Sequence, residues 1–574
     1  MPEKEEKNRK TIAARQSRPE RFRAKLSPPG VLVVTTECRG IKKNCSSVHR
    51  HSQPPAQPSH PTVLGDCLGE KGLGPTEGHS RALEWTGAAE EKICFFMAKN
   101  LASLQVYCKI AVETAMARKY FGTDGVRARA NTFPMTADFA LRLGVAVAKI
   151  LKRRNSRKTS VVIGKDTRLS CYMLESALTA GLTAGGAREV FLIGPIPTPG
   201  IAMLTRSLRC SLGIMISASH NPYYDNGIKL FDSSGVKFPE EIEEEIEAII
   251  DSPDLMENLP LDGRIGRAWR SENYMYQQRY IEHVKSGFPR NMSLHGLRVV
   301  LDCANGASYR VAPTILWELG ADVLKLGCQP DGTNINDGCG SMHPELLQST
   351  VVEKHADLGM AFDGDADRII MVSEDGRVVD GDKIIALLAR NMLEEGRLRN
   401  NTVVLTHMSN LGLELYLRSL GLNVLRTKVG DRYVAEEMRK NDLNLGGEQS
   451  GHIIMGDYST TGDGISCGLR VLALVQMAKQ LNPRAKFSDL LDLYRPVPQR
   501  QCNIKFSGDR PNPLELEPVR QFIEEQSRKL ENIGRVLVRK SGTEPLLRVM
   551  VECTENDLLD AVFTAIGEKI GEYL

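Results

Sequence analysis

The feature that most constrains the fold is a unit of helix and strand that recurs between residues 118 and 490. A helix followed by a glycine-containing turn and a strand occurs three times, at GGAREV (185–190), LGADV (319–323) and LGLNV (420–424). Alternation of strands and helices favours parallel pairing through right-handed crossovers. The sequence therefore predicts one α/β domain used three times, with mixed sheets.

The boundaries of these domains follow from composition and pattern. A chain of 574 residues is too long for one core and suggests three or four domains. We expect α/β domains at 116–270, 271–373 and 374–492. The apolar runs GRVLVRK and LLRVMVE with a closing helix predict a smaller α+β domain at 493–574.

Residues 1–115 lack the pattern of a domain. Arg, Lys, Pro, Ser and Gly dominate, and apolar periodicity is nearly absent before Cys94, so little surface could be buried against the entropy of ordering. Three interpretations compete: a disordered basic arm, a transit peptide that acidic residues such as Glu3 argue against, and an untranslated extension. The organised pattern that begins at Met116 favours the last, with translation starting there or at Met97.

Composition excludes several classes of protein. Charged residues make up 25% and hydrophobic residues 41%, and no apolar run approaches the roughly 18 residues that span a bilayer. Residues 1–50 hold 13 Lys/Arg against 5 Asp/Glu and the remainder 61 against 66, so no global basic field suggests a nucleic-acid partner. The 13 cysteines show no zinc spacing, which predicts free thiols in a reducing, cytoplasmic compartment.

The stretch GIMISASHNPYYDNGIK (213–229) is the first candidate site. Its apolar start predicts a buried strand that ends in a turn with Ser219 and His220. A hydroxyl beside an imidazole at the carboxyl end of a strand suits nucleophilic chemistry, because open α/β sheets bind ligands at that edge. Taken alone, Ser and Asn are also ordinary turn residues.

The sharpest signal is AFDGDADRII, in which Asp363, Asp365 and Asp367 alternate directly after a predicted strand. In extended backbone their carboxylates fall on one side, and converging hard oxygens suit Mg²⁺. The spacing resembles an EF-hand, but Arg368 replaces the required glycine and the predicted flanks are strands. A metal-free turn is the other alternative, although packed carboxylates repel one another without a cation.

Two further turns carry arginines at strand ends, in KYFGTDGVR (119–127) and IGKDTR (163–168). Arg127 and Arg168 could each bind a phosphate bidentately, or could be ordinary surface arginines beside capped turns. The acidic helix EEIEEEIEAII (240–250) is different, since its isoleucines share one face and its glutamates are expected to be solvated.

Two loops in the second half of the chain suit a sugar phosphate. GGEQSGH (446–452) places Glu448 and Ser450 in a glycine-framed loop that could hydrogen-bond sugar hydroxyls, or could be a simple tight turn. RKSGTEP (539–545) could form an anion nest. The residues of that nest would be Ser541, Gly542 and Thr543, with Arg539 and Arg548 alongside.

Taken together, SASHNP, DGDADR, GGEQSGH and RKSGTEP, in this order and spacing, resemble the α-D-phosphohexomutase superfamily over residues 118–574. The stretches RKYFGTDGVR and GDRYV (430–434) resemble the branch that acts on glucosamine phosphates. Cys171 and Ala366 stand where that pattern usually has glycine, and Cys171 adds a thiol near the turn of Arg168.

The resemblance implies an isomerase with its domains around a central cleft. It would interconvert glucosamine 6-phosphate and glucosamine 1-phosphate through a phosphoserine, with hexosamine 1,6-bisphosphate as primer and intermediate, and so supply UDP-N-acetylglucosamine and peptidoglycan precursors. Mg²⁺ would be held by phosphorylated Ser219 with Asp363, Asp365 and Asp367, and the partners would be a phosphosugar and a second copy of the chain. The remaining implied residues are His220, Lys229, Arg127 and Arg368 for catalysis, Glu448 and Ser450 for the sugar, and Arg539, Ser541, Gly542, Thr543 and Arg548 for the second phosphate.

Four alternatives remain at this stage. They are a phosphomannomutase/phosphoglucomutase, a plain Mg²⁺-dependent phosphatase, a non-catalytic phosphosugar sensor, and a nucleic-acid-binding protein that acts through its basic arm. The presence of Ser219, the three aspartates and Lys229 argues against a sensor that has lost catalysis.

Overall fold

The computed structural model describes residues 118–154, 159–270, 274–506, 512–531, 533–540 and 546–574. The prediction for residues 1–115 therefore lies outside the described residues. The described chain forms four β-sheets of seven, five, four and three strands. No helix in these ranges is long and apolar enough to cross a membrane.

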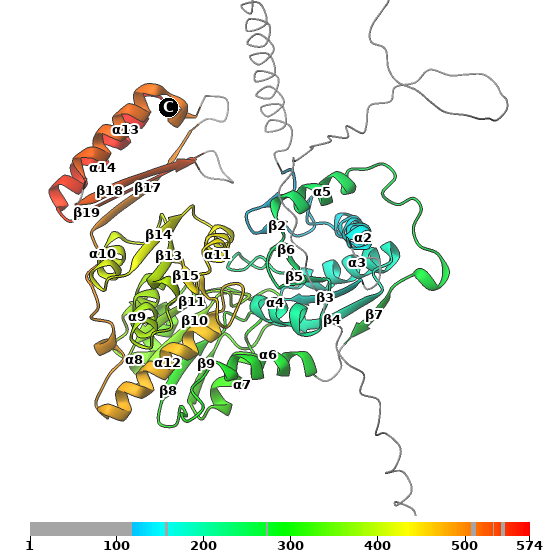
Figure 1. The fold of residues 1–574 in the computed structure, drawn as a ribbon, viewed down its shortest axis with the longest axis horizontal. Helices are drawn as coiled ribbons and strands as arrows, with labels where there is room; N and C mark the ends of the chain where they lie inside the picture. The colour runs from blue at the N-terminus through cyan, green and yellow to red at the C-terminus, as the bar shows by residue number, and fades with distance from the viewer. Residues whose placement is uncertain (1–117, 155–158, 271–273, 507–511, 532, 541–545) are drawn as a thin grey trace, which may run out of the picture. The chain divides into compact units, whose positions relative to one another are not determined.

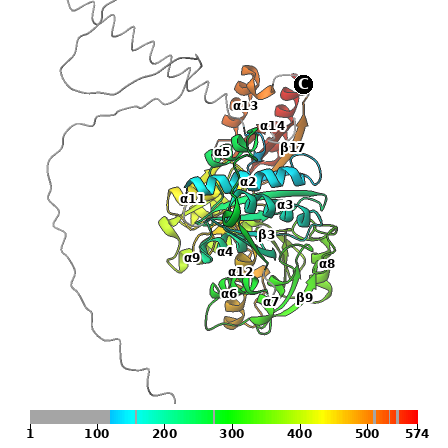
Figure 2. The ribbon, with the colours of Figure 1, turned by 90° about the vertical axis from the view of Figure 1, so that its right-hand side faces the viewer.

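The first sheet has the order β1-β2-β6-β5-β3-β4-β7 (Figure 1). Its strands are β1 (Phe121–Gly122), β2 (Gly125–Arg129), β3 (Ser160–Lys165), β4 (Glu189–Pro195), β5 (Leu212–Ile216), β6 (Asp225–Asp232) and β7 (Arg267–Arg270), and its helices are α2 (Ala137–Arg154), α3 (Ser170–Gly185), α4 (Thr198–Ser207) and α5 (Glu240–Ile250). α2 and α3 lie side by side (Figure 2). Val161 and Ile163 pack with them, whereas Val162 packs into the core on the opposite face. Both faces of β3 are thus buried, which explains its continuous apolar sequence.

The second and third sheets have the orders β12-β11-β10-β8-β9 and β14-β13-β15-β16. The second unit comprises α6 (Met275–Ser286), β8 (Arg298–Asp302), α7 (Val311–Glu318), β9 (Asp322–Leu326), α8 (Glu345–Glu353), β10 (Leu358–Phe362), β11 (Ile369–Ser373) and β12 (Val378–Val379). The third comprises α9 (Gly381–Glu394), β13 (Thr402–Thr406), α10 (Leu411–Ser419), β14 (Asn423–Thr427), α11 (Asp431–Lys440), β15 (Leu445–Gly447), β16 (Ile453–Met455) and α12 (Gly464–Leu481).

The C-terminal sheet is antiparallel, with the order β17-β19-β18. Its elements are β17 (Gln499–Lys505), α13 (Glu517–Lys529), β18 (Gly534–Lys540), β19 (Leu546–Cys553) and α14 (Asn556–Gly571). Apolar residues of β19, α13 and α14 form a separate small core. This is the predicted α+β domain.

The three larger sheets share one strand order, which confirms the predicted repeat. The sequences β4-β3-β5-β6, β9-β8-β10-β11 and β14-β13-β15-β16 each contain three parallel strands followed by one antiparallel strand. The antiparallel partner makes each sheet mixed instead of purely parallel, because the chain returns there by a short loop. That loop, between the third and fourth strands of the repeat, carries Ser219, Asp363–Asp367 and Glu448 in turn.

The expectation that the glutamates of α5 are all solvated is wrong. Glu243 and Glu247 are only 2% and 7% exposed. Glu247 accepts hydrogen bonds from the backbone N–H groups of residues 119–121, at 2.7–2.8 Å. Glu243 accepts a bidentate pair from Arg432 of α11, at 2.6 and 2.9 Å, and a third bond from Arg118. The acidic face of α5 therefore packs against the start of the described chain and against the third domain.

Candidate active site

Ser219 lies in the loop between β5 and β6 and is 1% exposed. Its φ of 54° is in the left-handed region, which is uncommon for a residue with a side chain and frequent at functional sites. The backbone N–H donates to Ser217 Oγ at 2.9 Å, and Ser219 Oγ donates to Asp363 Oδ2 at 2.5 Å. The hydroxyl predicted to carry chemistry therefore contacts the predicted metal loop of another domain.

Arg168 does not have the phosphate-binding role that its turn suggested. It is fully buried, and its Nε donates to Asp166 at 2.8 Å. Its other N–H groups donate to four carbonyl oxygens of the serine loop, those of Ser219, Asn221, Pro222 and Asp225. All five donors of the guanidinium are thus used inside the protein, and none remains for a ligand.

Asp166 completes the support beneath the serine loop. It accepts hydrogen bonds from Ser217 Oγ at 2.7 Å and from the Cys171 thiol at 3.2 Å. Burial raises the pKa of that thiol well above its usual range, so Cys171 stays a neutral donor. The residue that replaces the usual glycine is therefore part of the packing under the loop.

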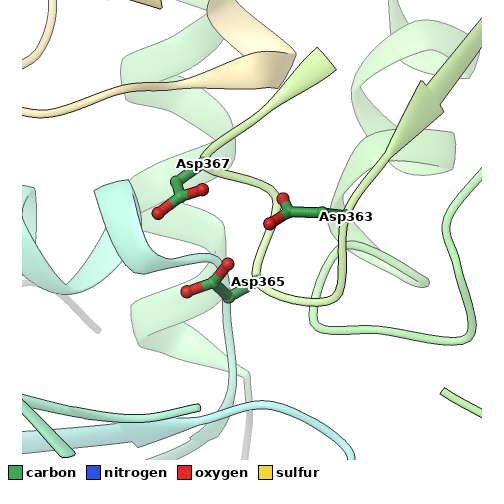
Figure 3. Close-up of side chains that lie close together, drawn as sticks. All are labelled: Asp363, Asp365 and Asp367. Atoms are coloured by element: carbon green, nitrogen blue, oxygen red, sulfur yellow. The ribbon is translucent and has the colours of Figure 1, made fainter. Parts of the chain in front are cut away.

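The three aspartates of the β10–β11 loop converge as predicted. Each offers an oxygen within 4.8 Å of the others, and all three are buried (Figure 3). Asp365 Oδ1 and Asp367 Oδ1 have no hydrogen-bond partner among the described residues. Buried carboxylate oxygens without a donor are costly unless a cation binds them, so this set fits a hard divalent ion. The flanking elements are the antiparallel strands β10 and β11, which excludes an EF-hand.

Burial and neighbouring charges shift the pKa values of the aspartates in the metal loop. Burial raises the pKa of Asp363 well above its usual range, and the charges of Asp367 and Asp365 add to the rise. Burial alone would also raise the pKa of Asp367, but Lys229 and His452 outweigh it and hold that pKa well below its usual range. The site therefore has a local excess of negative charge that a cation would offset.

Lys229 on β6 lies at the centre of the charged groups. Its Nζ contacts Asp365 at 2.8 Å, Asp124 at 3.1 Å and Asp367 at 3.2 Å, and it is 1% exposed. Burial would lower its pKa, but these three carboxylates raise it well above the usual range. Lys229 is therefore a fixed ammonium that balances the carboxylates.

Sequence reasoning missed several members of this site. Lys237 contacts both Asp124 and Asp431, and His452 lies 3.5 Å from Asp367 and 3.6 Å from Asp431. With Lys229 these residues close a ring of charges across the first, second and third domains. Asp124, Asp431 and His452 stood inside motifs that had been noted, whereas Lys237 had no local signal of this role.

The other predicted catalytic residues surround the serine. His220 Nδ1 lies 3.4 Å from Ser219 Oγ, and burial, assisted by Arg368 and Arg127, lowers the His220 pKa to about 3. The backbone N–H of Arg368 donates to Asp363 Oδ1 at 3.2 Å. The side-chain Nε of Arg127 and of Arg368 is buried without a hydrogen-bond partner among the described residues, and Arg368 Nε lies 3.9 Å from Asp367 Oδ1. Each guanidinium group thus retains an N–H group that could donate a hydrogen bond to an anion.

The loop of Glu448 and Ser450 packs directly on the metal hairpin. A Cβ on Gly451, whose φ is 87°, would lie 2.0 Å from the Ile369 carbonyl oxygen, and Ile369 N–H donates to Gly451 O at 3.1 Å. Glu448 Oε1 accepts the Gly430 N–H at 2.9 Å, and Ser450 is exposed. Only glycine fits this close approach, which fixes the loop beside the aspartates.

Arg539 and Arg548 face each other across β18 and β19. They line a cavity of about 410 Å³ together with Met408, Gln501 and Asn503. Burial and the neighbouring charge of Arg548 lower the pKa of Arg539. Neither arginine forms an ion pair with a carboxylate of the described chain, so both are available to an anion. The predicted nest residues Ser541, Gly542 and Thr543 lie outside the described residues.

Comparisons with known proteins agree with this site. The chain matches the phosphoglucomutase/phosphomannomutase family in all four of its domains, at 118–257 (alpha/beta/alpha domain I), 278–376 (domain II), 380–496 (domain III) and 502–569 (C-terminal domain). The chain therefore belongs to this phosphohexomutase family, which the sequence motifs had indicated. The four matches together cover most of the described residues.

Two curated relatives have a more specific name than the family. A phosphoglucosamine mutase of Mesorhizobium japonicum is 53% identical over 457 residues, which is 80% of this chain and 99% of that protein. One of Parvibaculum lavamentivorans is 52% identical over 455 residues, 79% of this chain and 99% of that protein. Two solved structures share the fold: a phosphoglucomutase/phosphomannomutase family protein of Burkholderia thailandensis (TM-score 0.65, 22% identity, 79% of this chain and 97% of that one) and an Aspergillus fumigatus N-acetylphosphoglucosamine mutase (TM-score 0.55, 17% identity, 80% and 96%).

Proposed function

We propose that this chain is an isomerase that interconverts glucosamine 6-phosphate and glucosamine 1-phosphate, the reaction implied by the names of its roughly 50% identical relatives. The observation that carries the proposal is the 2.5 Å contact between Ser219 Oγ and Asp363, within a buried aspartate triad. A serine hydroxyl at that position is suited to hold a phosphoryl group beside a divalent ion.

The proposed reaction begins with phosphorylated Ser219. The P–Oγ bond breaks as a sugar hydroxyl oxygen bonds to phosphorus, which leaves the serine hydroxyl and hexosamine 1,6-bisphosphate. The intermediate reverses its orientation within the cleft, and its other phosphoryl group is transferred to Ser219. The enzyme therefore gains and loses no net phosphate in one cycle. The attacking hydroxyl loses its proton and the departing Ser219 oxygen gains one, and His220, whose Nδ1 lies 3.4 Å from Ser219 Oγ, would relay that proton.

The side chains have separable roles in this scheme. Asp363, Asp365 and Asp367 would hold Mg²⁺, which when bound neutralises charge on the transferring phosphoryl group. Lys229 keeps those carboxylates in place, and Arg127 and Arg368 have donors free for phosphate oxygens. Glu448 and Ser450 would bind sugar hydroxyls. Arg539 and Arg548, together with Ser541, Gly542 and Thr543, would hold the phosphate that does not react.

The metabolic role, the cellular location and the oligomeric state are also part of the proposal. The reaction would feed UDP-N-acetylglucosamine and hence peptidoglycan precursors. The eight cysteines of the described ranges are free thiols, which suits a cytoplasmic location. A homodimer also remains a prediction.

Two measurements test the function. A coupled assay with glucosamine 6-phosphate, primed with the bisphosphate, should give glucosamine 1-phosphate, and intact mass should show one phosphate on the native protein. Ser219→Ala should abolish both while the circular dichroism spectrum is retained. A near-normal rate for Ser219→Ala, or release of inorganic phosphate as the only product, would refute the proposal.

The second candidate is a phosphomannomutase/phosphoglucomutase, because the family descriptions cover these substrates. Relative kcat/KM on glucosamine, glucose and mannose phosphates separates the two. We expect the glucosamine phosphate to be preferred.

A further inference from the structure

Asn410, at the end of the loop between β13 and α10, holds the linker that leads to the C-terminal domain. Its Oδ1 accepts the Val497 N–H at 2.9 Å, and its Nδ2 donates to the Val497 carbonyl at 3.0 Å. Val497 lies between α12 and β17, where the chain crosses into the C-terminal domain. One buried side chain therefore satisfies both backbone polar groups of one linker residue.

The same loop and the first residue of α10 also contact strands β18 and β19 of the C-terminal domain. Arg535 on β18 donates to the Ser409 carbonyl at 2.5 Å, and the Leu411 N–H donates to Glu552 on β19 at 3.4 Å. Arg535 and the fully buried Glu552 form an ion pair at 2.5 Å. β18 and β19 also carry Arg539 and Arg548. The loop thus contacts the linker and the strands that present the phosphate-binding arginines.

The first turn of α9 holds this loop from the other side. Asp382 is 1% exposed, and its Oδ2 accepts the Asn410 N–H at 2.7 Å. Lys383, one residue further, donates to the Leu491 carbonyl at 3.3 Å and to the Tyr494 carbonyl. The turn is therefore bonded to the loop at one residue and to the linker region at the next.

The sugar-binding loop packs on the same turn. Gly381 N–H donates to the Gln449 carbonyl at 3.0 Å, and Gln449 Nε2 donates to Asp380 at 3.2 Å. A Cβ on Gly381 would lie 2.2 Å from the Glu448 carbonyl oxygen, so the two backbones are in direct contact. Four consecutive residues, 380–383, thus contact the sugar-binding loop and the linker.

We propose that Asp382 and Asn410 are positioning residues that set the phosphate-binding arginines of the C-terminal domain relative to the sugar-binding loop. They touch no substrate and act through the first turn of α9 and through Val497. The inference rests on the proposed function, because the geometry they set is what retains the bisphosphate intermediate while it turns over. Loss of either residue should increase escape of that intermediate.

Matched variants separate this role from general stability. Asn410→Ala removes both linker bonds and the bond to the Gly412 N–H at the start of α10, and Asn410→Asp keeps the acceptor but loses the donor. Asn512→Ala is the control, since Asn512 accepts the Leu514 N–H in the same way at a short helix without contacting the linker. Asp382→Leu removes the acceptor for Asn410, and Asp382→Asn retains it.

The kinetic readout is the requirement for hexosamine 1,6-bisphosphate. Asn410→Ala loses two linker hydrogen bonds, each worth roughly a fivefold change in an equilibrium constant, so KM and the half-maximal bisphosphate concentration should rise by up to about 25-fold. Asp382→Leu loses one hydrogen bond and should raise both about fivefold. The kcat at saturation should stay within about threefold of wild type, Asn410→Asp should be intermediate, and Asn512→Ala and Asp382→Asn should match wild type. The proposal is overturned if Asn410→Ala matches Asn512→Ala, or if only kcat falls.

A substrate-free measurement makes the outcome independent of the proposed function. Hydrogen exchange of the peptide that contains Val497 should be faster in Asn410→Ala and Asp382→Leu than in Asn512→Ala, and equal exchange overturns the proposal. The kinetic comparison uses whichever of glucosamine, glucose or mannose phosphate the wild type isomerises best. A wild type that prefers mannose phosphate contradicts the proposed function alone.

Discussion

Substituting Gly364 with alanine tests whether the contact between the serine loop and the metal loop determines kcat. A Cβ at Gly364 would lie 2.5 Å from the Ser219 carbonyl oxygen and 2.8 Å from Ile335 Cδ1, whereas ordinary contacts start at 3.4 Å. The Ser219 carbonyl is held by Arg168 and by Asn336, each at 2.9 Å, so the metal loop must give way, by about 0.9 Å. This shift opens the 2.5 Å contact between Ser219 Oγ and Asp363.

A displacement near 1 Å can cost on the order of a hundredfold in rate, and we expect kcat to fall by about that factor. The free energy of unfolding should fall by only about 1–3 kcal/mol, because overpacking is local. The assay is glucosamine phosphate isomerisation at saturating Mg²⁺ and bisphosphate, with intact mass to measure phosphate on Ser219.

Gly567→Ala in α14 provides the matched control. A Cβ there meets no atom within 4 Å, and the position is helical, so activity should be unchanged and stability should rise by about 0.5–1 kcal/mol. The reasoning is refuted if Gly364→Ala keeps kcat within about threefold of wild type while folded and phosphorylated.

Three further predictions follow from the same geometry. Asp365→Asn should raise the Mg²⁺ concentration for half-maximal activity at least about tenfold, and EDTA should abolish wild-type activity until Mg²⁺ is restored; an unchanged Mg²⁺ titration would exclude Asp365 as a ligand. Glu243→Leu leaves the buried Arg432 without its bidentate partner and should cost roughly 3–5 kcal/mol in urea unfolding, whereas a loss below about 1 kcal/mol would contradict the importance of this pair. Burial, with the charge of Asp380, raises the pKa of Asp382 from 3.8 to about 7, so the native state holds a proton that the unfolded state releases between these values. Stability should therefore fall as pH rises from about 5 to 7, by at most about 2 kcal/mol, and level off above 7; Asp382→Asn should lose this dependence in thermal melts, and identical profiles would be evidence against the shift.

Much of the fold was accessible from sequence because the strands are apolar on both faces and the helices are bounded by clear turns. The helix at 240–250 has the bounds that its pattern predicted. The aspartates were predictable as a set, but the extended backbone expected for them is wrong, because residues 363–367 form a turn in which the Ala366 N–H donates to the Asp363 carbonyl at 3.0 Å. Their link to Ser219 was not a local property, since 144 residues separate Asp363 from Ser219 in the chain.

The errors have a common physical cause, which is pairing between distant segments. Arg168 was expected to be either a phosphate ligand or a surface arginine because its sequence neighbours form a turn. It is instead buried, and four of its acceptors are carbonyls about 50 residues away, including that of Ser219. The glutamates of α5 looked solvated because the cation that buries Glu243, Arg432, is 189 residues further along. Lys237 likewise gained its role from Asp124 and Asp431, which are 113 and 194 residues away in the chain.

The shared strand order has a consequence for how this molecule can be divided. Each of the three equivalent loops supplies a different part of the proposed site. A fragment with the first domain alone would therefore hold Ser219 without the aspartates, the second would hold the aspartates without Ser219, and the third would hold neither. The proposed site would thus depend on the contacts between domains, which include the ion pair of Glu243 and Arg432. Substitutions at these contacts between domains should lower activity as active-site substitutions do, although the substituted residues contact no ligand.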